Sequence, residues 1–354
     1  MPESKISFLV YGAYGYTGEL IARLAVEKGH RPLLGGRNEA KLKALAEELK
    51  LPYVAFNLTE EDALNKALQQ VKVVLHCAGP FSKTARLMVY ACLRNKVHYL
   101  DITGEIEVFE WIAKQDALAK KAGIVLLPGA GFDVVPTDCL AAYLKSQLPD
   151  AQQLELAFYG VQRMSRGTAL TMLENIHQGG MIRENGKLKK VTAAYKTRKI
   201  DFGHKQKEAV TIPWGDVSTA YYSTAIPNIT VYTAVGTAAL AFIKLSRYTG
   251  KLLASPFFQN KLKNLVDSRV KGPDQNKRQQ GKSYIWGEVL NNQGEARIAR
   301  LQTPEGYFLT AQTALLAAEL LVDGKTEPGF NTPSMAFGPD FILQIPGTTR
   351  EDVR

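Results

Sequence analysis

The sequence is poor in the residues that bind metals or build disulfide frameworks. It holds only three cysteines, Cys77, Cys92 and Cys139, and five histidines that stand apart from one another. The cysteines are odd in number, and their spacing fits no zinc pattern. The chain contains no Cys-x-x-Cys or His-x-x-x-His pair, so we predict no metal site. Reduced thiols in a cytoplasmic protein are the simplest account of the cysteines.

Long hydrophobic runs are also missing. The first residues, Met1 to Lys5, are polar and lead directly into an apolar, strand-like run, so we expect no signal peptide. The longest uncharged, mostly apolar stretch, residues 225–243, contains Pro227, Asn228 and Gly236. A membrane span needs about 20 predominantly apolar residues, and this stretch is too polar for its length. We interpret it as buried or interfacial; if it lines a cleft, it indicates an apolar substrate.

Charge of one sign is in excess, but it is not concentrated anywhere. Lysine and arginine exceed aspartate and glutamate by 44 to 34, which gives a formal net charge of +10. Such an excess favours acidic partners, among them phosphates and anionic lipid surfaces. A generally basic surface without a specific partner is the simpler explanation. Because no basic arm or long basic run occurs, we expect no nucleic-acid partner.

The first third of the chain alternates strand and helix signals. Apolar runs that suit buried parallel strands occur at residues 6–11, 31–35, 53–56, 71–77, 97–101 and 123–127. Apolar residues at helical spacing lie between and beside them, at residues 17–28, 39–49, 59–69, 84–95 and 108–122. The alternation predicts an α/β fold over residues 1–136, a doubly wound parallel sheet with right-handed crossovers.

The pattern changes in the second part of the chain. Residues 137–303 are interpreted as a second, α+β domain, with helices at 136–148 and 167–182 and strand signals at 154–161 and 187–231. Two strand-like runs flank Asn291-Asn292-Gln293-Gly294, a hairpin signal that predicts a mixed or antiparallel sheet. Residues 304–354 begin with a helix over 305–322. We expect little regular structure after Thr326, where proline and glycine are frequent.

A glycine-rich turn stands between the first strand and the first helix, and reads Gly12-Ala13-Tyr14-Gly15-Tyr16-Thr17-Gly18. In such a turn the first glycine permits a tight bend, the middle one lets a pyrophosphate approach, and the last lets helix and strand pack closely. The helix N-terminus then presents N–H groups to the anion. At the first turn of a βαβ pattern, the motif predicts a Rossmann-type dinucleotide site rather than a turn without ligand.

The end of the second strand indicates which dinucleotide binds. An NAD site usually has Asp or Glu about 20 residues after the glycines, to bind the ribose 2′-hydroxyl. Here the sequence reads Leu34-Gly35-Gly36-Arg37-Asn38. A guanidinium can bind a 2′-phosphate through paired hydrogen bonds, whereas a carboxylate would repel it. We therefore predict NADP rather than NAD, in contact with Arg37, Asn38 and Lys41.

Three further strand ends converge on the edge of the sheet where such folds bind ligands. They add to the predicted cofactor site Ala78, Gly79, Pro80, Phe81, Thr103, Gly104, Gly131 and Phe132. The candidates for catalysis are Tyr99, Asp101 and Asp133. For the two aspartates, proton donation competes with a simpler role, which is to bind backbone amides. His76 is interpreted as a core histidine rather than a catalyst.

Together these motifs resemble the saccharopine dehydrogenase-like family, and most of all its saccharopine dehydrogenase-like oxidoreductases and trans-acting enoyl reductases. The runs that carry the resemblance are Gly12 to Gly18, Gly35-Gly36-Arg37, Ala78-Gly79-Pro80-Phe81, Tyr99 to Glu105 and Gly131 to Asp138. Later runs also resemble motifs of that branch, so the resemblance covers nearly the whole chain: Gly167-Thr168, Gly329 to Pro333 and Phe337-Gly338.

The resemblance implies an NADP-type Rossmann domain, a second domain with a mixed sheet, and a C-terminal helix that returns to the first domain. It also implies redox chemistry by hydride transfer. It leaves the substrate open, since members range from amino-acid metabolism to lipid reduction. Asn57 departs from the pattern, because relatives often carry Asp after the third strand. No arginine set suited to an amino-dicarboxylate is evident, which argues against saccharopine as the substrate.

Three interpretations of the function remain. The first is a cytoplasmic NADP(H)-dependent oxidoreductase that moves hydride to or from a C=C, C=O or C=N group of a small molecule. The second is a short-chain dehydrogenase, because Tyr195 and Lys199 match its Tyr-x-x-x-Lys spacing, although in a strand-like segment. The third is a non-catalytic NADPH-binding scaffold or sensor, in peripheral contact with a membrane. By analogy of fold we also expect a homodimer formed through the sheet of the second domain.

Overall fold

The computed structural model describes residues 8–160, 179–236, 240 and 281–353. The chain divides into two compact units, and each unit combines two segments. The first unit is Met1–Val135 with Tyr307–Gly338, and the second is Pro136–Gly306 with Pro339–Arg354. The sequence predicts domain boundaries after residues 136 and 303. In the structure the chain leaves the first unit after Val135 and returns to it at Tyr307, close to both boundaries.

The first unit is built on a seven-stranded sheet in the order β15-β6-β5-β4-β1-β2-β3, with neighbouring strands parallel. Its strands are β1 (Phe8–Tyr11), β2 (Leu33–Gly36), β3 (Tyr53–Ala55), β4 (Val73–His76), β5 (His98–Asp101), β6 (Val125–Leu127) and β15 (Gly329–Phe330). The predicted doubly wound parallel sheet is confirmed. The strand order reverses between β1 and β4, and folds of this type bind ligands at that switch point.

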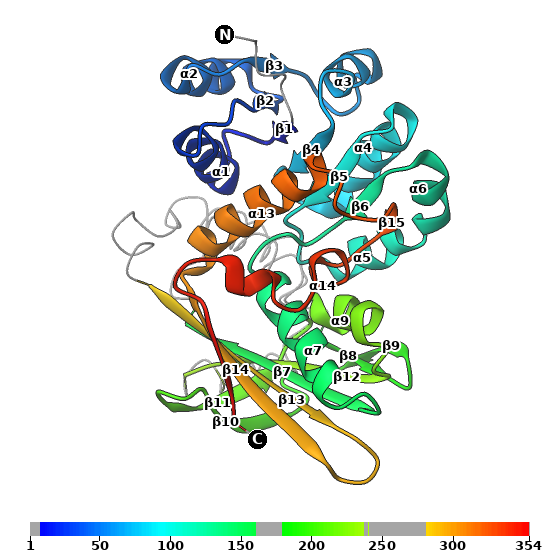
Figure 1. Ribbon diagram of the computed structural model, residues 1–354, viewed down its shortest axis with the longest axis vertical. Coiled ribbons are helices and arrows are strands. Elements are labelled where there is room, and N and C mark those ends of the chain that lie inside the picture. The colour runs from blue at the N-terminus through cyan, green and yellow to red at the C-terminus, as the bar shows by residue number, and fades with distance from the viewer. Residues whose placement is uncertain (1–7, 161–178, 237–239, 241–280, 354) are drawn as a thin grey trace, which may run out of the picture. The chain divides into compact units, whose positions relative to one another are not determined.

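Helices of the first unit flank this sheet (Figure 1). They are α1 (Tyr16–Glu27), α2 (Glu39–Leu49), α3 (Glu61–Leu68), α4 (Phe81–Asn95), α5 (Ile106–Ala113), α6 (Asp116–Ala122), α13 (Gly306–Val322) and α14 (Pro333–Phe337). The side chain of Asn38 caps α2 by accepting the N–H of Lys41 (3.0 Å). The single helix predicted over 108–122 is divided, because the N–H of Gln115 binds the carbonyl of Ile112 (2.9 Å) in a tighter turn.

The second unit contains a mixed sheet whose main path is β10-β11-β12-β7-β13-β14-β16, while β8 pairs with β12 and β9. Its strands are β7 (Gln153–Tyr159), β8 (Gly180–Glu184), β9 (Lys187–Val191), β10 (Thr197–Asp201), β11 (Gln206–Thr211), β12 (Asn228–Ala234), β13 (Lys282–Leu290), β14 (Ala296–Pro304) and β16 (Thr349–Asp352). Among the described pairs, β12 and β7 are parallel and the others antiparallel. The predicted second α+β domain with a mixed sheet is thus confirmed.

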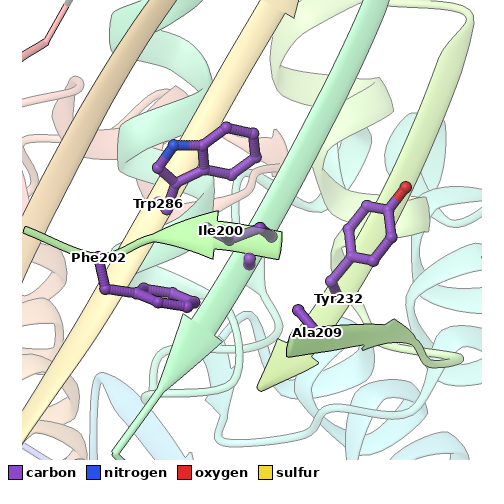
Figure 2. Close-up of a cluster of buried hydrophobic side chains, with 6 residues drawn as sticks. Ile200, Phe202, Ala209, Tyr232 and Trp286 are labelled. Carbon is purple, nitrogen blue, oxygen red and sulfur yellow. The ribbon is translucent and has the colours of Figure 1, made fainter. Parts of the chain in front are cut away.

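The two faces of the second sheet are covered differently. On one face, α7 (Val135–Gln147) approaches β13 so closely that a Cβ on Gly287 would lie 2.7 Å from Cδ1 of Leu144. The neighbouring residue, Trp286, points to the other face. There a buried cluster collects Ala157, Ile200, Phe202, Ala209, Tyr232 and Trp286. Figure 2 shows Ile200 of β10 between Trp286 and Tyr232, which come from different strands of the sheet.

Two local predictions for the second unit are wrong. Residues 180–182 belong to β8 rather than to a helix over 167–182, whose first part, 167–178, lies outside the described residues. The strand-like stretch 187–231 contains a helix, α9 (Asp216–Thr224). Its β-branched and aromatic residues favour strands locally, but most of its residues are buried, and tertiary packing overrides such propensities.

The C-terminal tail is more regular than predicted. Strand β15 pairs with β6 in the first sheet, and β16 pairs with β14 in the second, with η1 (Phe341–Gln344) between them. Residues 307–338 therefore join the first unit. Residues 339–354 join the second, which corrects the expectation that the whole of 304–354 returns to the first domain. The partners of β15 and β16 are distant in the chain, so the residues around each strand do not indicate the pairing.

The apolar stretch 225–243 is largely explained by the core of the second unit. Its residues 228–234 form β12, where Ile229, Val231 and Tyr232 are almost completely buried. Residues 237–239 and 241–243 lie outside the described residues. None of the described helices is long and apolar enough to cross a membrane. The part of the stretch from Ile229 to Tyr232 is therefore ordinary core.

Candidate cofactor and catalytic site

The turn between β1 and α1 requires glycine at two points. Gly12 has a φ of +87°, and a Cβ on it would lie 2.9 Å from the backbone nitrogen of Ala78. A Cβ on Gly18 would lie 2.3 Å from the carbonyl oxygen of Gly12. The turn thus packs against the end of β4 on one side and against its own helix on the other. A larger residue at either point would push these backbones apart.

The N-terminus of α1 faces this turn without a side-chain cap. Gly15 is the N-cap residue, and its N–H donates to the carbonyl of Gly12 (2.9 Å), which closes the turn. A Cβ on Gly15 would lie 3.1 Å from the same oxygen. The first N–H groups of a helix have no partners within it and carry the positive end of its dipole. The pyrophosphate of a dinucleotide fits this place.

The end of β2 brings a tyrosine and two cations together. Tyr14 lies against Gly36, where an added Cβ would be 2.7 Å from Cε1 of the ring. Nζ of Lys41 lies 5.9 Å from the centroid of the same ring. Arg37 is exposed, and its guanidinium forms no ion pair or hydrogen bond with any described residue. The described part of the chain therefore leaves this guanidinium available to an anionic ligand.

The charge of Arg37 acts on Tyr11, the last residue of β1. The Tyr11 O–H donates to the carbonyl of Phe56 (3.1 Å). Burial raises the pKa of this phenol to about 12, and Tyr14 and Glu60 add to the rise, whereas the positive charge of Arg37 opposes it. Of the three residues predicted to bind the 2′-phosphate, Asn38 is already engaged as the cap of α2.

The loop after β4 is held from inside the unit by Thr84. Its Oγ1 donates to the carbonyl of Ala78 (2.7 Å) and lies 3.0 Å from Nε2 of His76. Burial lowers the pKa of His76 to about 3, so its ring is neutral and donates the Nε2 proton to Thr84. His76 therefore supports the loop. The predicted cofactor residues of that loop all keep some exposure: Ala78, Gly79, Pro80 and Phe81.

Glu105 joins the loop after β5 to the loop after β4. Its two carboxylate oxygens accept the backbone N–H groups of Phe81 (2.7 Å) and Ser82 (2.8 Å), in the first turn of α4. Its own N–H donates to Oγ1 of Thr103 (3.1 Å). A carboxylate is stabilised at a helix N-terminus by the dipole. The start of α4 is thus occupied by an anion of the protein, whereas Gly15 leaves the start of α1 open.

Tyr99 and Asp101 are fully buried and hold two strand ends together. The Tyr99 O–H donates to one carboxylate oxygen of Asp101 (2.6 Å), and the other oxygen accepts the N–H groups of Thr103 (3.0 Å) and Gly129 (2.9 Å). Burial raises the pKa of Asp101 to about 6, although these hydrogen bonds oppose the rise. The contacts give Asp101 the simpler of its two predicted roles, which is to bind backbone amides.

Asp133 has very different surroundings. Its side chain keeps some exposure, and its Oδ2 would be 2.7 Å from a Cβ on Gly104. Among the described residues, its carboxylate has no hydrogen-bond or ion-pair partner. Burial raises the pKa of Asp133 to about 6, so it keeps its proton to a higher pH than an ordinary carboxyl does. These properties suit a proton donor.

Two threonines of α13, which the sequence does not single out, hold the loop that carries Asp133. Oγ1 of Thr310 accepts the N–H of Phe132 (2.9 Å), and Oγ1 of Thr313 donates to the carbonyl of Ala130 (2.8 Å). Between them, a Cβ on Gly131 would lie 2.8 Å from Cγ2 of Thr310. The two contacts join residues 178 and 183 positions apart, so no local pattern could have indicated them.

Comparison with known proteins identifies the first unit. Residues 8–127 match the family model of the saccharopine dehydrogenase NADP binding domain. The match runs from β1 to β6 and includes the phosphate turn, Arg37, and the ends of β4 and β5. The family resemblance and the NADP-binding character expected from the sequence are therefore confirmed for this domain.

Two curated proteins are similar to about two fifths of this chain. The saccharopine dehydrogenase-like oxidoreductase of Mus musculus is 26% identical over 160 residues, which cover 40% of this chain and 37% of that protein. The trans-acting enoyl reductase of Mycobacterium leprae is 30% identical over 144 residues, which cover 38% of this chain and 34% of that protein. The matches thus span little more than a third of either relative.

One solved structure is similar over the whole length. The apo form of saccharopine dehydrogenase (L-Glu forming) from Saccharomyces cerevisiae aligns with a TM-score of 0.67 at 14% sequence identity. The alignment covers 99% of this chain and 100% of that one. The saccharopine dehydrogenase fold is therefore shared by both units of the chain.

Tyr195 and Lys199 do not form the site of a short-chain dehydrogenase in this fold. Tyr195 is 41% exposed and precedes β10, in which Lys199 is paired with Glu208 of β11. A spacing of four places two side chains together on a helix. In a strand the same spacing extends over about 13 Å. The match to Tyr-x-x-x-Lys is thus a coincidence of spacing.

Three remaining predictions concern a later motif, metal binding and the cysteines. The motif Gly167-Thr168 falls outside the described residues. Within the described ranges no group of three or more His, Cys, Asp or Glu side chains is placed to hold a metal ion. Cys77, Cys92 and Cys139 form no disulfide in the described part of the chain.

Proposed function

We propose that the protein is an NADP(H)-dependent oxidoreductase of the saccharopine dehydrogenase-like type, which transfers hydride to or from a double bond of a small molecule. The observation that carries the proposal is the combination of the open N-terminus of α1 with the unpaired Arg37 at the end of β2. The first suits the pyrophosphate, and the second suits the 2′-phosphate of the same dinucleotide. The names of the mouse and mycobacterial relatives support oxidoreductase chemistry.

The residues divide into three groups in this proposal. The turn from Gly12 to Gly18 binds the pyrophosphate through backbone N–H groups. Arg37 and Lys41 bind the 2′-phosphate, and Tyr14 keeps Lys41 beside it through the contact of its ring with the ammonium group. The exposed loop Ala78 to Phe81 lines the path towards the nicotinamide. His76, Thr84 and Glu105 support that loop from within the protein.

When bound, NADPH supplies a hydride to one atom of the substrate's double bond. The other atom needs a proton, and we assign its donation to Asp133. The carboxyl O–H bond breaks, the new bond to the substrate takes the proton, and the carboxylate that remains recovers a proton from water at its exposed side. In the oxidative direction the Asp133 carboxylate accepts the proton. Asp101 takes no part in this transfer, because its carboxylate already accepts three hydrogen bonds.

We propose enoyl compounds as the first substrates to examine, because one relative is a trans-acting enoyl reductase. Carbonyl and imine compounds complete the panel, since the same hydride and proton reduce all three kinds of bond. Oxidation of NADPH is followed by absorbance with each compound. Turnover of any of them supports the proposal. Tight NADPH binding without turnover across the panel would instead support a non-catalytic scaffold.

Cofactor choice is tested separately from turnover. Arg37→Ala is expected to weaken NADPH binding about 10- to 100-fold, because hydrogen bonds to a charged group contribute about 1.5–3 kcal/mol. NADH binding should change by about threefold at most, since it lacks the 2′-phosphate. Arg31→Ala is the matched control: Arg31 precedes the amino end of the same strand and donates to the carbonyl of Lys50 (2.7 Å). Equal losses for NADPH and NADH in Arg37→Ala would refute the assignment.

A further inference from the structure

Helix α13 contacts the ligand edge of the first sheet through one of its faces. Tyr307, Thr310 and Thr313 follow each other at a spacing of three, which places them on that face. The ring of Tyr307 meets the ring of Tyr16, in the phosphate turn, edge to face at 4.9 Å. Thr310 and Thr313 hold the loop of Asp133. One helix therefore touches both the turn for the cofactor and the loop of the proposed acid.

The position of α13 is fixed along its length. Near the C-terminal end of α13, Oε1 of Glu319 lies 2.8 Å from Nε2 of His30, which follows α1. Because Tyr307 and Tyr16 meet at the other ends of the same helices, α13 and α1 run side by side in the same direction. The strand that follows, β15, pairs with β6. Thr310 is 8% exposed and Thr313 is not exposed at all. A helix held at both ends is a firm support for whatever it binds.

The loop from Gly129 to Val135 is also fixed on its other side. The N–H of Gly129 donates to Oδ1 of Asp101 (2.9 Å), and the N–H of Ala130 donates to the Asp101 carbonyl (2.7 Å). Within the loop, the N–H of Val135 binds the carbonyl of Gly131 (2.9 Å). The stretch between Gly131 and Val135 includes Phe132, Asp133 and Val134. From outside the loop, Thr310 accepts the N–H of Phe132, and Gly104 lies against the Asp133 carboxyl.

We propose that Thr310 is a positioning residue, which sets the direction of the Asp133 carboxyl by holding the N–H of the preceding residue. The inference rests on the proposed function, in which Asp133 donates the proton. Thr310 itself touches neither substrate nor cofactor in this account. Its effect is large because proton transfer needs donor and acceptor within about 3 Å, and a displacement of about 1 Å can reduce a rate about 100-fold.

The test compares Thr310→Val with Thr310→Ser in the full-length protein. Valine removes the acceptor and places a methyl group 2.9 Å from where the Phe132 nitrogen now lies, so the loop must move. Serine keeps the oxygen. Thr310→Ala removes the oxygen without adding bulk, and it repeats the test if the valine variant does not fold. Thr303→Val is the matched control, because Thr303 is also buried (0% exposed, against 8% for Thr310) but lies in β14 of the second sheet.

The first readout needs no substrate. Carboxyl NMR titration should show that the pKa of Asp133, about 6 in the parent protein, falls towards the ordinary value of about 4 in Thr310→Val, because the displaced loop admits water. NADPH affinity should fall much less than kcat, since the phosphate turn and Arg37 stay in place and only the predicted contacts of Gly131 and Phe132 shift. With a compound from the panel, kcat should fall at least about 10-fold while KM changes little. Thr310→Ser should restore both the pKa and kcat.

The outcomes separate this inference from the proposed function. If Asp133→Asn turns over as fast as the parent protein, Asp133 is not the proton donor and the role of Thr310 falls with it, whereas the turnover itself still supports the oxidoreductase function. If Asp133→Asn loses turnover but Thr310→Val and Thr310→Ala keep the parent pKa and kcat, only the role of Thr310 is overturned. The same conclusion follows if Thr310→Ser is as impaired as Thr310→Val, or if Thr303→Val has an equal effect.

Discussion

Asp101 and Asp133 show how much the immediate surroundings of a single residue decide. The pKa values of Asp101 and Asp133 are both raised to about 6 by burial. Asp101 is surrounded by three donors, which makes it a structural acceptor. Asp133 has no such partner among the described residues. A carboxylate in that position is unfavourable for the fold, and groups of this kind are typical of functional sites.

We expect Asp133→Asn to stabilise the folded protein at pH 7. The folded-state pKa of about 6 exceeds the unfolded value of about 4, so the folded state holds the proton more tightly. The stability that this proton contributes is complete below about pH 4 and is lost as the pH rises through about 6. Asparagine has no charge and avoids the loss, which at pH 7 amounts to about 2 kcal/mol. Urea unfolding of both proteins at pH 4 and pH 7 measures it.

Asp101→Ala should act in the opposite direction. It leaves Tyr99 and two backbone N–H groups without an acceptor, and each unpaired buried donor costs about 1–3 kcal/mol. A stability gain in Asp101→Ala, or a loss at pH 7 in Asp133→Asn, would contradict the different roles assigned to the two residues.

At the scale of the elements, the second sheet contains a pair of like charges that needs a cation. Glu155 of β7 and Glu288 of β13 lie directly opposite each other, an arrangement that destabilises neighbouring strands. Nη1 of Arg198, from β10, donates to both carboxylates. Its guanidinium also lies 4.7 Å from the centroid of the Trp286 ring, beside the core cluster of Figure 2. Arg198 thus links β10 to β7 and β13, two strands with which β10 does not pair.

Arg198→Met should therefore lower the free energy of unfolding by about 2 kcal/mol, because it leaves two partly buried carboxylates facing each other. The estimate is modest since all three side chains keep some contact with water. Adding Glu288→Gln to Arg198→Met should recover about half of the loss, because the repulsion disappears. Urea unfolding of the two single variants and the double variant gives the coupling. Strictly additive losses would show that Arg198 contributes by packing alone.

At the scale of the whole molecule, the sequence predicted those features that depend on neighbouring residues in the chain. Helix α2 was predicted over its full observed range, and the glycine turn with Arg37 indicated the cofactor domain that the family match confirms. Helix α9 was interpreted as strand, because its propensity and its burial point in opposite directions. The contact of Thr310 with Phe132 and the pairing of β15 with β6 depend on long-range packing. A single sequence contains no record of such partners.

The last sixteen residues show the same long-range dependence, because they close the second unit. The guanidinium of Arg350 lies 3.5 Å from the centroid of the Tyr143 ring, and the Tyr143 O–H donates to Oδ2 of Asp352 (2.8 Å). Phe341 and Ile342 are completely buried. The segment thus ties α7 to the edge of the second sheet, where β16 pairs with β14. The segment is assigned to the second unit.

Phe341→Ala should therefore weaken the second unit selectively. A buried Phe→Ala change costs about 3–5 kcal/mol. Here the loss falls on the unit that contains Trp286, in β13, and Trp214, which precedes α9. In a Trp111→Phe background, tryptophan fluorescence reports the second unit alone, while NADPH binding reports the first. We expect the fluorescence transition to move to lower urea while NADPH binding persists. Met335→Ala, at a site that is 45% exposed in the first unit, is the control and should shift neither signal. If Phe341→Ala moves both signals together, the two units unfold as one, and the stability of the cofactor domain depends on a tail whose contacts lie in the other unit.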